Sequence, residues 1–226
     1  MAVHEVDRGA FWDRKILKWE SDKYESTSRT FFNRSVQARL FLGAHLLEQL
    51  APGASIVEMG CGSARLLPKL VGCNPLSYVG VDISGEAIAE ARQLAERLAP
   101  GFPVTLIEGT AEDLEPQKAD LCFSLGLLDW LAPEEVEAML CAVSCRYFFH
   151  SYSEKRNSPS QQLHRLYAYL MYGHKTGRYV PRYMAWEDVE AMVGRATGAQ
   201  ARVFRSPKLS FGTLVHNLPE DTSFAA

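Results

Sequence analysis

Four residues beside two strand-like segments have the types and spacing of a ligand-binding turn. Glu58, Gly60 and Gly62 end an apolar run that begins at Ile56, and Asp82 closes a second apolar run. Two residues without Cβ atoms let the backbone turn sharply and let a ligand come close. The helix expected behind them presents free N–H groups. This pattern predicts a nucleotide or cofactor site, and the alternative is an ordinary strand–helix connection that contains two glycines.

The residue types at this turn argue against a phosphate ligand. Arg65 stands where a dinucleotide-binding turn needs its third small residue, and the G-K-[ST] of a P-loop is missing. The Glu58 carboxylate would repel a pyrophosphate but attract a cation. The two oxygens of Asp82 can accept both hydroxyl groups of a ribose, or the residue can cap the next helix. A ribose beside a positive charge, without phosphate, describes S-adenosylmethionine.

Buried strand patterns alternate with helical ones on both sides of this turn. We expect strands at residues 56–59, 77–82, 104–108, 120–125 and 146–150, and a closing antiparallel pair at 201–204 and 212–216. Helices fill the intervals, including one that begins at Pro133. The pattern predicts an α/β fold, a doubly wound Rossmann-like sheet of seven mostly parallel strands with an antiparallel last strand and helices on both faces.

Two further regions are expected around this core, which we place at residues 53–226. Residues 1–52 predict an N-terminal helical cap, whose aromatic stripe with Trp12 and Trp19 is interpreted as packing. Residues 152–183 interrupt the alternation with a helix at 162–171 and a glycine-broken aromatic segment. We interpret this second region as an insert, or lid, on the acceptor side.

Composition narrows the class of protein. The chain has 226 residues, of which 47% are hydrophobic, and a net charge of −3, so nothing global indicates nucleic acid or an anionic membrane. The five cysteines form no C-x-x-C pair, which predicts thiols in a reducing compartment and no metal site. No signal-like N-terminus or membrane-length apolar run occurs. We expect a cytoplasmic protein without a membrane span.

Taken together, the motifs resemble the class I S-adenosylmethionine-dependent methyltransferases of small molecules. Glu58-x-Gly60-x-Gly62 with Asp82 is followed by the segments 109–114 and 120–131 in the family's order and spacing. The likeness covers roughly residues 53–150, and the terminal hairpin agrees with the family's reversed seventh strand. The resemblance implies an enzyme that moves a methyl group from S-adenosylmethionine to an O, N or C atom by in-line displacement.

The resemblance also implies positions that contact the cofactor. They are Glu58, Gly60, Cys61 and Gly62; Asp82 and Ile83; Thr110, Ala111 and Glu112; and Ser124, Leu125 and Gly126. The turn passes beneath the methionine part, Asp82 holds the ribose and Ile83 covers the adenine. Many members carry an acid where this chain has Thr110, which puts an acidic contact to the adenine amino group in doubt. Tyr24 and Arg34 are candidates for the methionine carboxylate, with simple packing as the alternative.

The acceptor side is less defined. Asp129 and His150 follow the fourth and fifth strands and are candidates to take a proton or orient the acceptor. Asp129 could instead be a surface acid, and His150 a buried histidine bonded to backbone. The segment 151–182 contains six basic residues and a single acid, Glu154. We expect either a solvated surface or a site for an anionic acceptor, a carboxylate or a phosphate, formed by Tyr172, Arg178, Tyr179, Arg182 and Tyr183.

Two other functions stay open. One is methylation of RNA or protein, against which stand the mild acidity and the absence of an N/D-P-P-Y/F motif after the fourth strand. The other is a partner subunit that binds S-adenosylmethionine without catalysis, because an intact cofactor turn establishes binding and not turnover. A small-molecule methyltransferase is the function that we favour.

Overall fold

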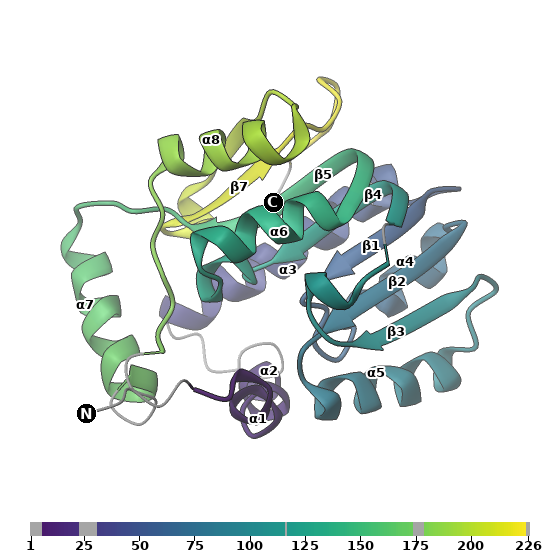
Figure 1. Ribbon diagram of the computed structural model, residues 1–226, viewed down its shortest axis with the longest axis horizontal. Helices are drawn as coiled ribbons and strands as arrows, with labels where there is room; N and C mark the ends of the chain where they lie inside the picture. The colour runs from purple at the N-terminus through teal and green to yellow at the C-terminus, as the bar shows by residue number, and fades with distance from the viewer. Residues whose placement is uncertain (1–5, 23–30, 116, 174–178, 225–226) are drawn as a thin grey trace.

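The computed structural model describes residues 6–22, 31–115, 117–173 and 179–224, and its centre is one seven-stranded sheet (Figure 1). The strand order is β3-β2-β1-β4-β5-β7-β6, with β7 antiparallel to both of its neighbours and the other pairs parallel. The strands are β1 Ser55–Met59, β2 Ser77–Asp82, β3 Val104–Glu108, β4 Gln117–Leu125, β5 Val143–Ser153, β6 Arg202–Arg205 and β7 Gly212–His216. The Rossmann-like fold class predicted from the sequence is confirmed.

The strand order places the candidate site. β1 lies between β2 and β4, so the chain moves outward in opposite directions on its two sides. A crevice opens at such a switch point, beyond the carboxyl ends of the strands. Met59, Asp82 and Leu125 are the last residues of β1, β2 and β4, and they meet at this edge.

Helices cover both faces of the sheet (Figure 1). On one face lie α3 Phe31–Leu50, α4 Leu67–Cys73 and α5 Gly85–Leu98, and on the other lie α6 Pro133–Ala142 and α8 Trp186–Thr197. Leu42, Leu46 and Leu47 of α3 are fully buried against the sheet. Burying side chains of this size contributes about 1.5–3 kcal/mol each, so α3 is part of the sheet's core layer.

Two short helices, α1 Arg8–Asp13 and α2 Ile16–Glu20, precede α3 and lie below the carboxyl edge of the sheet in Figure 1. Helices this short are not stable alone, so tertiary contacts must hold them. Phe11 is buried, and the Ser84 hydroxyl donates a hydrogen bond of 2.8 Å to Asp13. The positions of α1 and α2 are therefore set by their contacts with the region that they cover.

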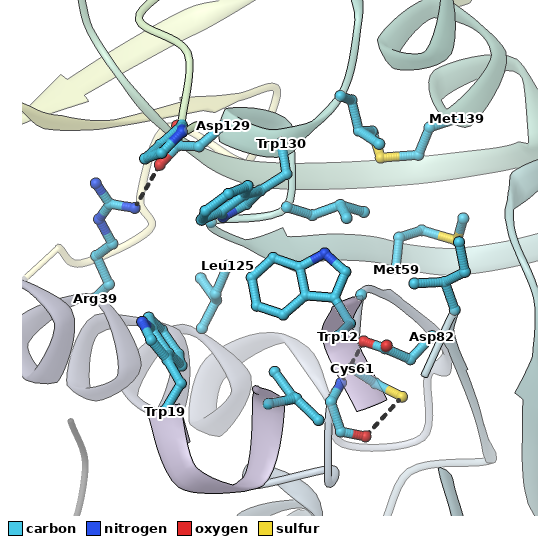
Figure 2. A pocket seen from close by; sticks show the side chains of 18 of the residues that line it. Trp12, Trp19, Arg39, Met59, Cys61, Asp82, Leu125, Asp129, Trp130 and Met139 are labelled. Atoms are coloured by element: carbon cyan, nitrogen blue, oxygen red, sulfur yellow. Dashed lines mark hydrogen bonds and ion pairs between the residues drawn. The ribbon is translucent and has the colours of Figure 1, made fainter. Parts of the chain in front are cut away.

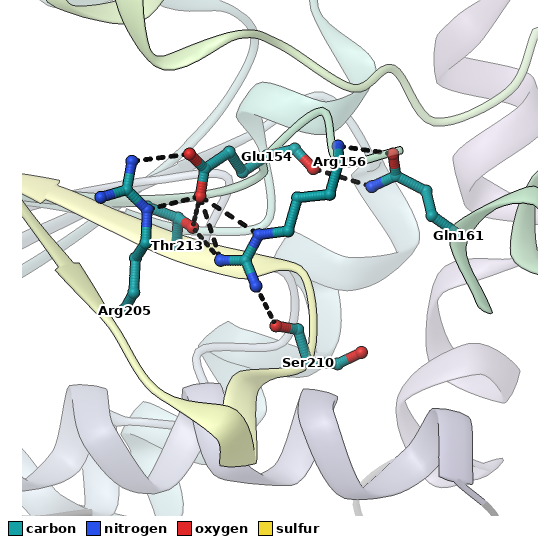
Figure 3. Close-up of polar contacts among 6 residues, drawn as sticks. All are labelled: Glu154, Arg156, Gln161, Arg205, Ser210 and Thr213. Atoms are coloured by element: carbon teal, nitrogen blue, oxygen red, sulfur yellow. Dashed lines mark hydrogen bonds and ion pairs between the residues drawn. The ribbon is translucent and has the colours of Figure 1, made fainter. Parts of the chain in front are cut away.

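The insert contains α7 Pro159–Ala168, which continues as the π-helical turn η4 Tyr169–Gly173. Its start is fixed by a buried ion cluster around Glu154 (Figure 3). The Glu154 carboxylate accepts from Arg205 of β6 at 2.6 and 2.7 Å, and from Arg156 at 3.0 Å. Thr213 of β7 donates to the same carboxylate at 2.8 Å. The insert is thus attached to the terminal hairpin.

Several element boundaries differ from the sequence prediction, and two of these differences lie beside the candidate site. Gly62 to Leu66 form a tight turn, and α4 begins only at Leu67, so no helix directly follows the glycines. A positive φ of 56° at Ala64 interrupts the helical conformation there. In addition, β5 extends past His150 to Ser153, because its last residues pair with Gly212 to Leu214 of β7.

Candidate cofactor and acceptor cleft

A cavity of about 340 Å³ lies at the carboxyl ends of β1, β2 and β4 (Figure 2). Its size is in the range of small-molecule sites. It brings together most of the cofactor residues expected from the sequence, namely Glu58, Gly60, Cys61, Gly62, Asp82, Ile83, Thr110, Ala111, Glu112, Leu125 and Gly126. The other walls come from α1, α2, α3, α6, the turn η3 Leu128–Trp130, the insert and the segment before β7.

The glycine turn is fastened to the end of β2. Gly60 N–H and Cys61 N–H both donate to the Val81 carbonyl, at 2.7 and 3.0 Å. Gly60 and Gly62 have φ of 70° and 54°, a region that favours glycine. A Cβ at Gly60 would lie 3.0 Å from Leu127, so a side chain would crowd the cavity wall. The turn therefore needs glycine for both conformation and space.

The Asp82 carboxylate is directed into this turn and keeps acceptor capacity. Its Oδ2 accepts from Gly62 N–H at 2.8 Å, and its Oδ1 accepts from Ser84 N–H at 3.0 Å. Burial raises the pKa of Asp82, and these two hydrogen bonds oppose the rise. The cap of α5 is the Ser84 hydroxyl, which accepts from Ala87 N–H, so capping is not the task of the carboxylate. Each oxygen retains a lone pair for a ligand hydroxyl.

Glu58 is almost completely buried, at 5% exposure, and lies at the inner wall of the cavity. Burial raises the pKa of Glu58 to about 8, and the nearby carboxylates of Glu20 and Asp82 add to the rise. The Tyr78 hydroxyl opposes it by donating a hydrogen bond of 2.6 Å to Glu58 Oε2. Glu58 is therefore mainly neutral at pH 7, and a cation in the cavity would favour its ionised form.

Thr110 begins the 3₁₀ turn η2, Ala111–Asp113, beside the end of β3. Its hydroxyl accepts from Glu112 N–H at 3.3 Å, and Asp113 Oδ2 accepts from Thr110 N–H at 2.7 Å, which completes a capping box; the hydroxyl also donates to Asp113 at 3.0 Å. Because the Thr110 side chain is used in this cap, the turn is fixed without an acidic side chain at position 110. Thr110, Ala111 and Glu112 all line the cavity.

Asp129, in the 3₁₀ turn η3 Leu128–Trp130, lines the opposite side of the cavity and is ion-paired (Figure 2). Arg39 Nη1 of α3 donates to its Oδ2 at 3.3 Å, and the Ser153 hydroxyl donates at 2.8 Å. Burial raises the pKa of Asp129, while Arg39 and Ser153 lower it. Arg182 N–H donates to the Asp129 carbonyl at 2.6 Å, which ties the insert to this turn. The arrangement suits orientation of Arg39 better than proton abstraction.

His150 and Ser124 do not line the cavity. His150 is 1% exposed, and its Nδ1 lies 3.0 Å from the hydroxyl of the buried Ser124. Burial lowers the pKa of His150 to about 3, so the imidazole is neutral. This position gives His150 no contact with a molecule in the cavity, and we do not assign it to proton transfer.

Aromatic side chains close the cavity, and several come from the stripe interpreted as packing. Trp12, Trp19 and Trp130 surround the space in Figure 2, and Tyr172 and Tyr179 of the insert join them. The Trp12 and Trp130 rings meet edge to face with centroids 4.8 Å apart. Trp12 Nε1 donates to the Tyr179 hydroxyl at 3.2 Å. The N-terminal stripe thus contacts the insert over the site.

The remaining expected residues lie elsewhere. Arg182 and Tyr183 line a second hollow together with Lys155 and Arg165. Arg34 is exposed on α3 and does not line the cavity. Tyr24 and Arg178 lie outside the described residues.

Sequence reasoning missed five charged residues of the cavity, Arg8, Glu20, Arg39, Arg65 and Glu135. Only Arg39 carried a usable signal, because it shares an apolar helix face with Val36 and Gly43. Glu20 ends a helix whose position relative to the sheet no local pattern specifies.

Residues 6–22, 31–115, 117–173 and 179–224 contain no group of three or more His, Cys, Asp or Glu side chains placed to hold a metal ion. No helix in the same ranges is both long and apolar enough to cross a membrane.

Comparison with known proteins supports a methyltransferase core. A family model described as a methyltransferase domain matches residues 56–145, less than half of the chain. The cyclopropane-fatty-acyl-phospholipid synthase of Escherichia coli K12 is 30% identical over 95 residues, which are 42% of this chain and 24% of that protein. The carboxy-S-adenosyl-L-methionine synthase of Alteromonas mediterranea is 22% identical over 105 residues, 45% of this chain and 43% of the relative. The chain spans less than half the length of these curated relatives.

Solved structures share the fold over nearly the whole chain. Magnesium protoporphyrin IX methyltransferase from Synechocystis PCC 6803, crystallised with bound SAH, has a TM-score of 0.69 at 17% identity, covering 92% of this chain and 96% of that one. The CcbJ methyltransferase from Streptomyces caelestis has a TM-score of 0.60 at 15% identity, covering 87% and 94%. The resemblance to class I methyltransferases noted from the sequence is confirmed.

Proposed function

Starting from the methyltransferase domain at residues 56–145, we propose that this protein transfers a methyl group from S-adenosylmethionine to an O, N or C atom of a small acceptor. The observation that carries the proposal is the acid-flanked glycine turn. Asp82 keeps acceptor capacity for a ribose diol, and Glu58 is a buried neutral acid that a sulfonium would ionise. A Cβ at Gly60 would lie 3.0 Å from Leu127, and a Cβ at Gly62 would collide with Glu20, so the turn that lines the cavity has no room for side chains. The residues present therefore fit this cofactor.

When bound, the cofactor supplies a methyl group already activated for displacement. The protein's part is to orient and to exclude water. Asp82 and Ile83 would hold the nucleoside, and the backbone of Leu125 and Gly126 would meet the amino-acid end. Trp12 and Trp130 would keep solvent away from the methyl group. Such positioning is worth up to about 7–11 kcal/mol of the barrier, and a general base is needed only for a protonated acceptor.

The acceptor is small and carries an anionic group. A small acceptor suits a cavity whose outer wall is closed by the contact of Trp12 with Tyr179. The second hollow adjoins the cavity, since Leu131 and Pro181 line both. Its charged residues are Lys155, Arg165, Arg182 and Arg195 against Asp188. A carboxylate or phosphate of the acceptor would lie in this hollow, while its reacting atom lies in the cavity.

The decisive experiment incubates the protein with methyl-labelled S-adenosylmethionine and a cell extract fractionated by size. Label in a small anionic metabolite supports the proposal. Label in RNA or protein would instead select a macromolecular acceptor, and cofactor binding without label in any fraction would select a non-catalytic partner subunit. With an acceptor identified, Arg182→Ala should raise its KM about tenfold by removing a charged contact. An unchanged KM would remove the second hollow from the acceptor site.

The cytoplasmic location expected from the sequence is part of this proposal. All five cysteines are free thiols in the structure, which suits a reducing compartment. Fractionation of cells that produce the protein would test the location.

A further inference from the structure

Glu20 fills the cavity at the glycine turn, where its carboxylate is held by three donors. The residue ends α2 and is only 3% exposed. Its Oε1 accepts from Ser63 N–H at 3.1 Å, and its Oε2 accepts from the Ser63 hydroxyl and from Arg65 Nε, the latter at 3.3 Å. Gly62 makes this approach possible, because a Cβ there would collide with Glu20 Oε1.

The surroundings make this position unusual for an acid. Glu58 and Asp82 lie close enough that the charge of Glu20 raises the pKa of both. A carboxylate is stable beside two others only where strong donors compensate it. Ser63 and Arg65 supply two hydrogen bonds from one residue and a cation from the other, which are the groups that bind a carboxylate. The structure therefore contains a built carboxylate site, with a side chain of the protein in it.

We propose that Ser63 and Arg65 bind the carboxylate of the cofactor's amino-acid end, and that Glu20 occupies their site until the cofactor displaces it. The inference rests on the proposed function, since it names a subsite for the same cofactor. Glu58 and Asp82 already recognise the sulfonium and the ribose, and both flank the turn that carries Ser63. A second carboxylate cannot share these donors with Glu20, because like charges at hydrogen-bonding distance repel.

Displacement of Glu20 also changes the cover of the cleft. Trp19, the residue before Glu20, lines the same cavity, and α2 has only five residues. A helix this short is held by its tertiary contacts, so loss of the Glu20 contacts lets Ile16–Glu20 move. Cofactor binding and rearrangement of α2 are thus one event. The competing arrangement keeps Glu20 in place and pairs it with the cofactor's ammonium group.

The test compares two ligands in calorimetry, S-adenosylhomocysteine and methylthioadenosine, which lacks the amino-acid end. Glu20→Gln should bind S-adenosylhomocysteine about tenfold more tightly than the parent, because the binding-competent state no longer competes with an internal carboxylate. Its affinity for methylthioadenosine should stay within about twofold. Unchanged or weaker binding of S-adenosylhomocysteine to Glu20→Gln overturns the proposal, and weaker binding selects the ammonium contact.

Arg65→Ala and Ser63→Ala test the donors independently of Glu20. Each should weaken S-adenosylhomocysteine about tenfold and leave methylthioadenosine within about twofold. Equal losses for both ligands contradict a carboxylate subsite. Glu48→Gln is the matched control, since this exposed acid pairs with Lys69 away from the cavity. A parent protein that binds neither ligand would refute the proposed function itself, whereas binding of both without the Glu20 effect refutes only this inference.

Discussion

The cofactor cleft and the Glu154 cluster both bury carboxylates, but the pKa values of these carboxyl groups are shifted in opposite directions. In the cleft, Glu58 and Asp82 have hydroxyl and N–H donors and, within the described part of the chain, no arginine or lysine partner. Burial accordingly raises the pKa of both. In the cluster, Arg205 lowers the pKa of Glu154 to about 2, with Thr213 and Arg156 helping. The charge of Glu154 is thus neutralised by arginines of the protein itself, whereas Glu58 and Asp82 remain available to a ligand.

The difference separates binding from architecture. An ion pair completed inside the chain joins segments that are distant in sequence, here Glu154 of the insert and Arg205 of the terminal hairpin (Figure 3). A buried acid without a cationic partner in the protein lowers the stability of the folded state, and binding of a cationic ligand restores it. A carboxyl group with a shifted pKa therefore indicates a ligand site only when the direction of the pKa shift and the group that causes it are both known.

The largest effect is expected from Asp82→Ala. The substitution removes the acceptor of two charge-assisted hydrogen bonds to the ribose, each worth about 1.5–3 kcal/mol, so affinity for S-adenosylhomocysteine should fall about 100-fold or more. Calorimetry measures it. Asp120→Ala is the control, because the Asp120 carboxylate bonds Ser55 at the opposite end of β1 and should leave affinity unchanged. Equal affinities of parent and Asp82→Ala would contradict the assigned ribose contact.

Glu154→Gln should lower stability and spare cofactor binding. Removal of this buried negative charge leaves two arginines beside an uncharged amide and costs about 2 kcal/mol, which is a fall in Tm of about 4–8 °C. Differential scanning calorimetry tests this, with Glu137→Gln as the control for a surface pair with Arg195. If the folded Glu154→Gln protein bound S-adenosylhomocysteine with a changed affinity, the Glu154 cluster and the cofactor cleft would not be independent.

The same pair of proteins gives a pH test of the cluster. The folded pKa of Glu154, about 2, lies below its ordinary value of 4.5, so its stabilisation is present above pH 4.5 and is lost as pH falls towards 2. The Tm difference between parent and Glu154→Gln should therefore shrink over this interval. A difference that is constant from pH 6 to 3 would contradict the ion pair.

Glu58 should make the preference for S-adenosylmethionine over S-adenosylhomocysteine depend on pH. The pKa of Glu58 is raised to about 8, so in the ligand-free protein the carboxyl is neutral below this pH and charged above it. The ratio of the two affinities should rise about tenfold between pH 6.5 and 9, because only the sulfonium gains from the charge. Glu58→Gln should show a flat ratio. A parent ratio that does not change with pH would place the sulfonium away from Glu58.

Tyr78→Phe is expected to have the smallest effect. Loss of the hydrogen bond to Glu58 raises the pKa of Glu58 further, so the pH dependence of the affinity ratio should move to higher pH. The lost bond costs about 1 kcal/mol, or about 2–4 °C in Tm. The same titrations and scans measure both. A shift to lower pH would mean that Tyr78 does not stabilise the Glu58 anion.

Much of the fold and half of the site followed from local sequence. The strands β2, β3 and β7 have the predicted bounds, because runs of β-branched and apolar residues between turn signals are a local property. The glycine turn with Asp82 was equally readable, since it depends on φ values and on residues at strand ends. The doubly wound, mostly parallel sheet followed from the resemblance and from the alternation of elements.

What closes the cleft was decided only by tertiary structure. Trp12 meets Tyr179, Arg39 meets Asp129 and Glu20 meets Ser63, and each pair joins segments that are far apart in the chain. Of the basic residues of the insert that the structure describes, Arg156 pairs with Glu154, and Lys155, Arg165 and Arg182 line the second hollow and not the cavity. The sequence by itself determined the strands and the turn, whose conformations are set by neighbouring residues. It could not place short helices and an insert that have no stability of their own, because their positions are set by the surfaces on which they pack.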